Sequence, residues 1–171
     1  MIQIREADIW DSYEMAIVYR KALDKENVWM DYTEDSILKD MLSNPNSKFF
    51  IAINEFNEII GGAGVSESFM SNSVFEFCFL GVLPKYQHQG IGISLINARV
   101  KWMKSQKERR SLYAITGTRV PDLFRKMGWE THSDTAGLGC QTQKLLAWES
   151  WTTTPAPGGG SLPRASAPGR G

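Results

Sequence analysis

Three residues near the middle of the chain have the spacing of an anion-binding turn. Gln87, Gly90 and Gly92 lie in the stretch KYQHQGIGISL, after an apolar alternating segment and before a segment with helical spacing. A P-loop is excluded because no glycine of the chain is followed by Lys and then Ser or Thr. A GxGxxG dinucleotide fingerprint is excluded because Leu95 occupies its third glycine position. The pattern that fits is QxxGxG.

Such a turn binds a phosphate through its backbone. Free N–H groups and the positive end of the helix dipole favour an anion at a helix N-terminus, and a pyrophosphate suits several amides that point to one locus. Gly90 and Gly92 have no side chains to block its approach. A plain helix start with glycines for packing is the alternative interpretation. The amides expected to face the anion belong to Gln87, His88, Gln89, Gly90, Ile91 and Gly92.

The segments beside this turn are expected to be a strand and a helix. In the strand, residues 73–83, alternation sets Val74, Glu76, Cys78 and Leu80 on one face and Phe75, Phe77 and Phe79 on the other. In the helix, about residues 90–106, one side is formed by Leu95, Ile96, Arg99 and Met103.

The rest of the domain alternates between strand and helix patterns. Residues 1–7 read as a strand, and Asp8 is expected to cap a helix over residues 9–23. Thr33 is expected to cap a shorter helix over 34–42, and residues 48–66 read as a hairpin with its turn at 54–57. Further elements are a strand at 111–116, a short helix from Pro121 closed by Gly128, and a late strand at 144–151. The apolar face of the first helix is expected to hold Ile9, Tyr13, Ala16, Ile17 and Leu23.

This order predicts an α/β domain with a mixed sheet covered by helices. The domain is expected to span residues 1–151, because residues 152–171 are rich in Pro, Gly and Ser and cannot bury enough surface to fold. We interpret them as a flexible tail or an added extension.

The stretch FLGVLPKYQHQGIGISLI resembles the signature of the GNAT superfamily of acyl-CoA-dependent N-acyltransferases. That signature is a strand and turn followed by Arg or Gln, two residues, Gly, one residue, and Gly or Ala, at the start of a helix. The later LFRKMGWE resembles the family's LYxKxGFE segment, and the element order agrees over about residues 1–148. The resemblance implies a mostly antiparallel central sheet of six to seven strands, splayed in the middle and flanked by about four helices.

The resemblance also implies acetyl-CoA as the co-substrate, with its pyrophosphate at the glycine turn and no metal. The pantetheine arm is expected to lie where the strand 74–83 splays from the strand at 111–116, paired with the backbone of Leu80, Gly81 and Val82. A backbone N–H there is expected to stabilise the thioester oxygen. Phe124, in the short helix, is expected beside the coenzyme.

Glu76 is the candidate general base, because it falls where the histone-acetyltransferase branch of the family has its base, and apolar neighbours raise a carboxyl pKa. A glutamate on an open strand face, or one paired to an Arg, is the alternative. Phe124 departs from the family, which often has Tyr there to protonate the CoA thiolate. Tyr113, Cys140 or solvent are the weak candidate acids in its place.

The amine acceptor is expected near Trp29 and Tyr32, where the family builds one wall of its acceptor site, although core packing explains these aromatic residues equally well. His88 is expected to contribute its amide, whereas His132 fits the surface or the acceptor site. Neither histidine belongs to a metal pair.

Composition narrows the class of protein. The chain of 171 residues has 19 Lys and Arg against 19 Asp and Glu, which argues against nucleic acid as its partner. It has no apolar run long enough for a membrane span, no secretory signal pattern and no paired cysteines, so we expect a cytoplasmic protein. The leading hypothesis is an N-acetyltransferase acting on a primary amine of a small molecule. The alternatives are acetylation of a protein or peptide amine and a non-catalytic acyl-CoA-binding module, and a homodimer is left open.

Overall fold

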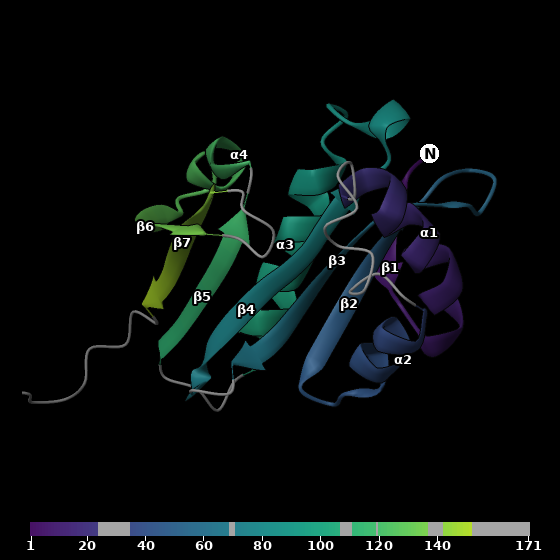
Figure 1. The fold of residues 1–171 in the computed structure, drawn as a ribbon. Coiled ribbons are helices and arrows are strands. Elements are labelled where there is room, and N and C mark those ends of the chain that lie inside the picture. The colour runs from purple at the N-terminus through teal and green to yellow at the C-terminus, as the bar shows by residue number, and fades with distance from the viewer. Residues whose placement is uncertain (24–34, 69–70, 107–110, 119, 137–141, 152–171) are drawn as a thin grey trace, which may run out of the picture.

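The strands and helices follow one another in the predicted order in a computed structural model that describes residues 1–23, 35–68, 71–106, 111–118, 120–136 and 142–151 (Figure 1). The first half comprises β1 (Gln3–Glu6), the 3-10 turn η1 (Ile9–Asp11), α1 (Ser12–Leu23), α2 (Asp35–Ser43), β2 (Ser47–Ile53) and β3 (Ile59–Ser68). The second half comprises β4 (Ser71–Val82), the 3-10 turn η3 (Pro84–Tyr86), α3 (Ile91–Lys104), β5 (Ser111–Thr118), α4 (Pro121–Arg125), β6 (Glu130–Ala136) and β7 (Thr142–Trp151).

The seven strands form one mixed sheet in the order β1-β2-β3-β4-β5-β7-β6. Every neighbouring pair is antiparallel except β4 and β5, which are parallel and are paired only from Val74–Tyr113 to Glu76–Ile115. Beyond these pairs the two strands diverge towards their carboxyl ends (Figure 1). The expected splayed, mostly antiparallel sheet is therefore confirmed.

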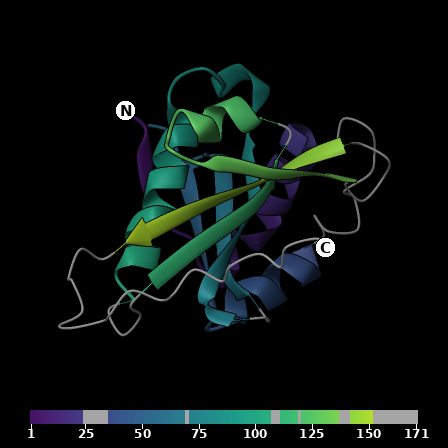
Figure 2. The ribbon, with the colours of Figure 1, turned by 90° about the vertical axis from the view of Figure 1, so that its left-hand side faces the viewer.

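Helices cover both faces of the sheet. Figure 2 shows α3 on one side of the strands and α1 with α2 on the other. On the α3 side, the core gathers β2, β3 and β4 residues around Leu95, Ile96 and Met103, and it continues to Phe124 and Trp129. On the α1 and α2 side, a second core packs Met15, Tyr19 and Leu38 against β2 and the start of β3.

The glycines of the sheet explain how α1 packs. If Gly62 had a Cβ atom, that atom would lie 2.7 Å from Tyr19 Oη, and a Cβ atom on Gly81 would lie 3.1 Å from the Tyr19 ring. The side-chain-free backbone thus leaves space for a tyrosine ring, and Tyr19 is fully buried there.

The expected buried face of α1 was consequently wrong in part. Ile9 and Tyr13 are 41% and 64% exposed, and the helix buries Met15, Val18 and Tyr19 together with the expected Ala16. Asp8 does act as a cap, but for η1: its carboxylate accepts from Trp10 N at 2.8 Å, and Asp11 accepts from Asp8 N at 2.8 Å. Thr33, the predicted cap of α2, lies outside the described residues.

Three other local predictions are confirmed. β2 and β3 form the hairpin, with Asn57 at a φ of 62° in its turn. Pro121 begins α4, and Gly128, at a φ of 85°, follows its end in the left-handed conformation that glycine adopts without strain. The buried side of α3 contains all four predicted residues, Leu95, Ile96, Arg99 and Met103.

Candidate functional site

The glycine turn joins the end of β4 to α3 through two left-handed residues. His88 has a φ of 62° and Gly90 a φ of 81°, so two of the three consecutive residues 88–90 have the left-handed backbone conformation. The side chain of Gln87 returns to the strand, where its Nε2 donates to Val82 O at 2.9 Å. Gln87, His88, Gln89 and Gly90 are exposed, whereas the buried side chain of Ile91 fixes the start of the helix to the core.

The start of α3 is open to an incoming anion. Gly90 is the N-cap and provides no side chain to bond the first turn. Ser94 N donates to Gly90 O at 3.0 Å, so the amides of the preceding residues 91–93 have no acceptor within the helix. A Cβ at Gly90 would meet nothing within 4 Å, and one at Gly92 would meet only Leu123 at 3.5 Å. These glycines are not required for internal packing, which favours the anion-binding interpretation over the packing one.

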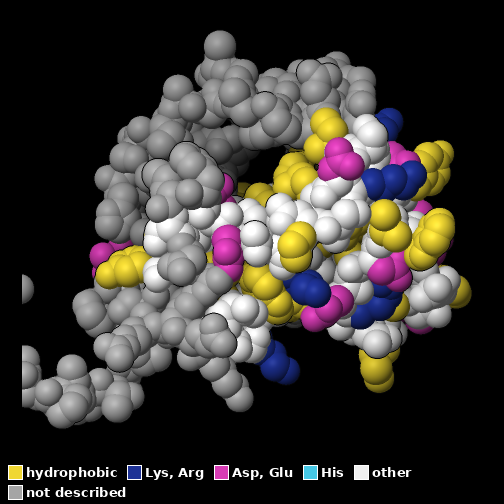
Figure 3. Space-filling model, turned by 90° about the horizontal axis from the view of Figure 1, so that it is seen from below, with side chains coloured by type: hydrophobic (Ala, Val, Ile, Leu, Met, Phe, Trp, Pro, Cys, Tyr) yellow, Lys and Arg dark blue, Asp and Glu magenta, His cyan; other side chains and the backbone are white. Residues whose placement is uncertain are grey.

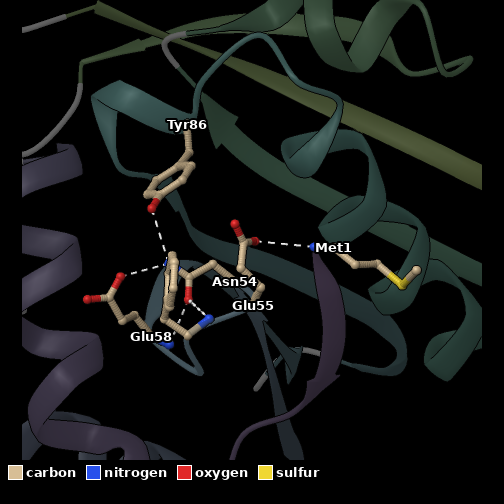
Figure 4. A network of polar contacts seen from close by, with 6 residues as sticks. Met1, Asn54, Glu55, Glu58 and Tyr86 are labelled. Atoms are coloured by element: carbon tan, nitrogen blue, oxygen red, sulfur yellow. Dashed lines mark hydrogen bonds and ion pairs between the residues drawn. The ribbon is translucent and has the colours of Figure 1, made fainter.

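A polar network holds this turn against the β2–β3 hairpin (Figure 4). Asn54 Oδ1 accepts from the amides of Phe56 and Glu58 at 3.0 and 2.9 Å, which closes the hairpin turn. Its Nδ2 donates to Glu58 Oε2 at 2.7 Å and to Tyr86 Oη at 3.1 Å. Asn54 therefore links the hairpin to the last residue before Gln87. The sequence marked Asn54 only as a turn residue, because its contact with Tyr86 is 32 positions away.

The point where β4 and β5 diverge is fixed by one side chain. The last backbone pair is Glu76–Ile115, and the next residue of β5, Thr116, donates its Oγ1 to Phe77 O at 2.9 Å. Thr116 is 5% exposed, so this bond is shielded from water. It satisfies the first β4 carbonyl beyond the parallel ladder. Because β5 also contains Ser111 and Thr118, no sequence signal was specific to this role.

β4 contains a bulge immediately after this point. Its pairing with β3 shifts from Gly64–Cys78 to Gly62–Gly81, so that Ala63 faces both Phe79 and Leu80. Phe79 has a φ of 51°, a conformation that is uncommon for a residue with a bulky side chain.

The bulge changes the faces that the alternation predicts. Phe75 and Phe77 belong to the α3-side core, as expected from their spacing, but Phe79 packs with Tyr19 and Phe49 on the other side. Leu80 and Val82 then lie against the α3-side core. The predicted common face of Leu80 with Glu76 and Cys78 was therefore wrong. The backbone of residues 80–82 is reoriented beside the diverging strands, where the pantetheine arm is expected.

Glu76 and Tyr113 lie on the same face of the sheet, next to the divergence. In the parallel ladder Val74 pairs with Tyr113 and Glu76 with Ile115, so the pleat directs Glu76 and Tyr113 to one side. Glu76 is half-buried and Tyr113 is 38% exposed. Cys78 lies on the same side of the sheet as Glu76 and Tyr113. The charge of Glu76 helps to raise the pKa of the Cys78 thiol.

Phe124 lies in the core. It is 1% exposed and packs edge to face on Trp129, with 5.2 Å between ring centroids, and Trp129 packs in the same way on Phe77 at 5.1 Å. Trp129, which the sequence did not single out, thus connects the short helix α4 to the centre of β4. Phe124 has no hydroxyl and almost no surface free for a ligand.

Other candidates lie outside what the structure describes. Trp29 and Tyr32 fall in the undescribed segment 24–34, and Cys140 falls in 137–141. Only the backbone of His132 is described, as part of β6. For the remaining cysteine, Cys78, desolvation raises the pKa of the thiol to about 12, which agrees with an inert residue.

A pocket of about 760 Å³ lies between α1 and the segment that leads into the glycine turn. Its lining joins Ile17 and Val18 of α1 to Ile59 and Ile60 of β3 and to residues 83–86. None of the predicted site residues that the structure describes is among its lining residues. We therefore place the candidate site at the glycine turn and the diverging ends of β4 and β5, outside this pocket.

The charges of the described surface are mixed. On the face seen in Figure 3, Lys and Arg side chains are interspersed with Asp and Glu side chains. Among the described residues, no group of three or more His, Cys, Asp or Glu side chains could hold a metal ion. None of the helices in the described part of the chain is long and apolar enough to span a membrane.

Comparisons with known structures agree on the fold. The PaiA N-acetyltransferase of Thermoplasma acidophilum, solved with coenzyme A, is 19% identical with a TM-score of 0.71, over 88% of this chain and 99% of that one. An aminoglycoside 6'-N-acetyltransferase complexed with coenzyme A is 16% identical with a TM-score of 0.69, over 86% and 96%. The NAA60 protein of Arabidopsis thaliana, solved with a bisubstrate analogue, is 16% identical with a TM-score of 0.65, over 88% and 97%.

No curated protein matches the chain by sequence. The profile of the acetyltransferase (GNAT) family, however, matches residues 9–129. This match runs from η1 through the glycine turn to Trp129, and it includes the divergent strands. The chain belongs to the GNAT family of acetyltransferases.

Proposed function

We propose that the protein transfers an acetyl group from acetyl-CoA to a primary amine of a small molecule, by direct attack in a ternary complex. The observation that carries the proposal is the position of the open glycine turn at the end of a strand that diverges from its parallel neighbour. At the turn, the amides of residues 91–93 have no acceptor within α3 and are available to a pyrophosphate. Beyond Glu76–Ile115, β4 has no backbone pairing with β5, which leaves that edge of the strand to an extended arm.

The residues of the turn and of β4 divide the binding of acetyl-CoA between them. The amides from Gln87 to Gly92 would hold the pyrophosphate, with the Gln87 amide also donating to Pro84 O at 3.2 Å. The backbone of Leu80, Gly81 and Val82 would pair with the pantetheine arm. A backbone N–H in this segment would donate to the thioester oxygen as negative charge develops there. The bulge at Phe79 supports this role because it shifts the register with β3 before Gly81 and Val82 pair with that strand again, and so turns Leu80 and Val82 towards the α3-side core.

Glu76 is proposed as the general base. The amine lone pair attacks the thioester carbon, the C–S bond breaks, and Glu76 accepts the ammonium proton, directly or through water. Glu76 is half-buried and is the last residue of β4 that pairs with β5. This position supports its role, because the new amide bond would form beside the same divergence.

The departing CoA thiolate takes up a proton from another group. Phe124 has none to give. Tyr113 is the candidate within the described residues, since it shares the Glu76 face and is partly exposed. Cys140 and solvent are the other sources.

The acceptor class rests on weaker support. Neighbours named as aminoglycoside and spermidine N-acetyltransferases favour a small amine, which we expect to contact Trp29 and Tyr32. The structure with a bisubstrate analogue favours a protein or peptide amine as the alternative. Phe124, which has no proton to give where the family often has Tyr, favours a third candidate, an acyl-CoA-binding module without transfer.

Two measurements test these candidates in turn. Acetyl-CoA at a hundred times its Kd is expected to stabilise the fold by about 2.7 kcal/mol, which raises Tm by about 5–10 °C. No shift at saturating acetyl-CoA would remove all three candidates. Release of CoA thiol is then followed with a polyamine, an aminoglycoside, and peptides with a free N-terminus or lysine. Binding without release from any of them identifies the non-catalytic module.

We propose further that residues 1–151 form the acetyltransferase domain and that 152–171 are a flexible tail. Acetyl-CoA and an amine are the proposed partners, with no metal, nucleic acid or membrane required. A cytoplasmic location and a homodimer stay predictions, and fractionation and light scattering test them.

A further inference from the structure

A buried arginine lies over the bulge of β4, and no carboxylate in the described part of the chain pairs with it. Arg99 projects from α3 and is 0% exposed. Its Nε and Nη2 have no hydrogen-bond partner among the described residues. Burial lowers the pKa of the guanidinium to about 10, so it stays charged at neutral pH.

Such a residue is costly as a core filler. A buried charge without a partner opposes folding, and an apolar side chain of similar volume commonly replaces it without loss of stability. The contacts that Arg99 does make therefore indicate its role.

Those contacts all lie at the bulge. Arg99 Nη1 donates to Gly64 O at 3.1 Å and to Cys78 O at 3.4 Å. Gly64 and Cys78 are the last regular pair of β3 and β4 before the register shifts. The guanidinium carbon also lies 4.4 Å from the centroid of the Phe77 ring, in a cation–π contact. One side chain thus binds both strands immediately before the strained Phe79.

We propose that Arg99 is a positioning residue: it clamps the β4 bulge and thereby sets the path of Leu80–Val82, the backbone that receives the acyl-CoA arm. A residue such as Phe79 keeps an unfavourable φ only when its surroundings hold it there. Arg99 holds one side of the bulge, and Tyr19 and Phe49 hold the Phe79 ring on the other. This inference rests on the proposed function, because it assumes that the arm binds at Leu80–Val82.

The test separates arm binding from nucleotide binding. CoA and 3'-phosphoadenosine 5'-diphosphate share the pyrophosphate and the nucleotide, but only CoA has the pantetheine arm. Both are titrated calorimetrically into the wild type, Arg99→Met, Arg99→Lys and Met103→Ala. The last variant opens the core on the same buried face of α3 and serves as the control for general loosening.

Arg99→Met is expected to weaken CoA by about ten-fold or more, the equivalent of a lost charged hydrogen bond, and to change the nucleotide fragment by less than about two-fold. Arg99→Lys keeps the charge and one donor direction, so its CoA affinity is expected to fall between those of the wild type and Arg99→Met. Met103→Ala is expected to leave the ratio of the two affinities unchanged. Amide exchange at Leu80–Val82 is expected to accelerate only in the Arg99 variants.

An unchanged ratio in Arg99→Met overturns the inference, as does an equal shift of the ratio in Met103→Ala. If Arg99→Met does not fold, Arg99→Lys provides the same comparison. If the wild type binds neither ligand, the proposed function is wrong. If the wild type binds both and the Arg99 variants bind them equally well, only the inference about Arg99 is wrong.

Discussion

Thr116 Oγ1 donates to Phe77 O at 2.9 Å, one residue beyond the last backbone pair of the two parallel strands. A side chain therefore makes the bond that a backbone amide would make if the strands stayed together. Thr116 ends the ladder without leaving the Phe77 carbonyl unpaired. The strands separate at a defined residue for this reason.

Removal of this hydroxyl is expected to destabilise the fold. Thr116→Val keeps the shape of the side chain but leaves the buried carbonyl without its donor, at a cost of about 1–3 kcal/mol. For a domain of this size that lowers Tm by several degrees, about 2–4 °C for each kcal/mol, measured by thermal unfolding. Thr116→Ser retains a hydroxyl and is the control. Equal losses in the two variants would contradict the assigned bond.

Substitution at Gly92 is expected to separate coenzyme binding from folding. A Cβ there makes only ordinary contact with Leu123, so Gly92→Ala should fold normally and, as in the family signature, still bind CoA. Gly92→Val adds two methyl groups beyond that Cβ at the helix start and is expected to reduce CoA affinity by more than about ten-fold, with Tm reduced by only a few degrees. Titration calorimetry and thermal unfolding measure the two effects. CoA binding by Gly92→Val at the wild-type level would place the pyrophosphate elsewhere.

Glu76→Gln is expected to lower kcat by about a hundred-fold or more, because the amide cannot accept the ammonium proton. CoA affinity should change little, since Glu76 lies outside the glycine turn. In the wild type the rate should rise with pH as the base loses its proton, and in the variant this acidic limb should move to higher pH and follow the deprotonation of the amine substrate. Tyr113→Phe, on the same face, tests the acid: a smaller loss of kcat is expected, with the profile altered at high pH. A Glu76→Gln enzyme with an unchanged profile would refute the role of Glu76 as base.

The Cys78 thiol is expected to resist alkylation in the folded protein. Its pKa is raised from 9.0 to about 12, so the thiolate is scarce at any pH below that range. By linkage, the stability that goes with the raised pKa is present below about pH 9 and is lost as pH rises towards about 12. In a Cys140→Ser background, iodoacetamide should modify Cys78 only after denaturation. Rapid modification of the folded protein at pH 8 would contradict the described environment.

The sequence predicts best what local patterns decide. The hairpin around Asn54–Asn57, the helix start at Gly90 and the end of α4 at Gly128 each depend on residues within a few positions of one another, and each is observed. The buried side of α3, which includes Arg99, follows from helical spacing alone.

Long-range packing explains the errors. Tyr19 is buried because Gly62 and Gly81, both more than forty positions away in sequence, leave room for its ring, and no helical pattern contains that information. Leu80 changes face because β4 has one more residue than β3 at the bulge, a mismatch visible only in the pairing of the strands. Thr116 and Trp129 likewise acquire their roles from contacts with Phe77.

The short parallel ladder has a consequence for how the protein opens. Only three residue pairs of backbone join β1–β4 to β5–β7, whereas the antiparallel pairs inside each half run longer. The sheet thus consists of two parts, β1–β4 and β5–β7, joined by a short parallel ladder that ends beside Glu76. We expect β5–β7 to unfold as one cooperative unit before global unfolding, and hydrogen exchange should detect this as earlier exchange of their amides. A ligand that contacts both β4 and β5 would then stabilise the sheet where its two parts are joined by the fewest backbone pairs.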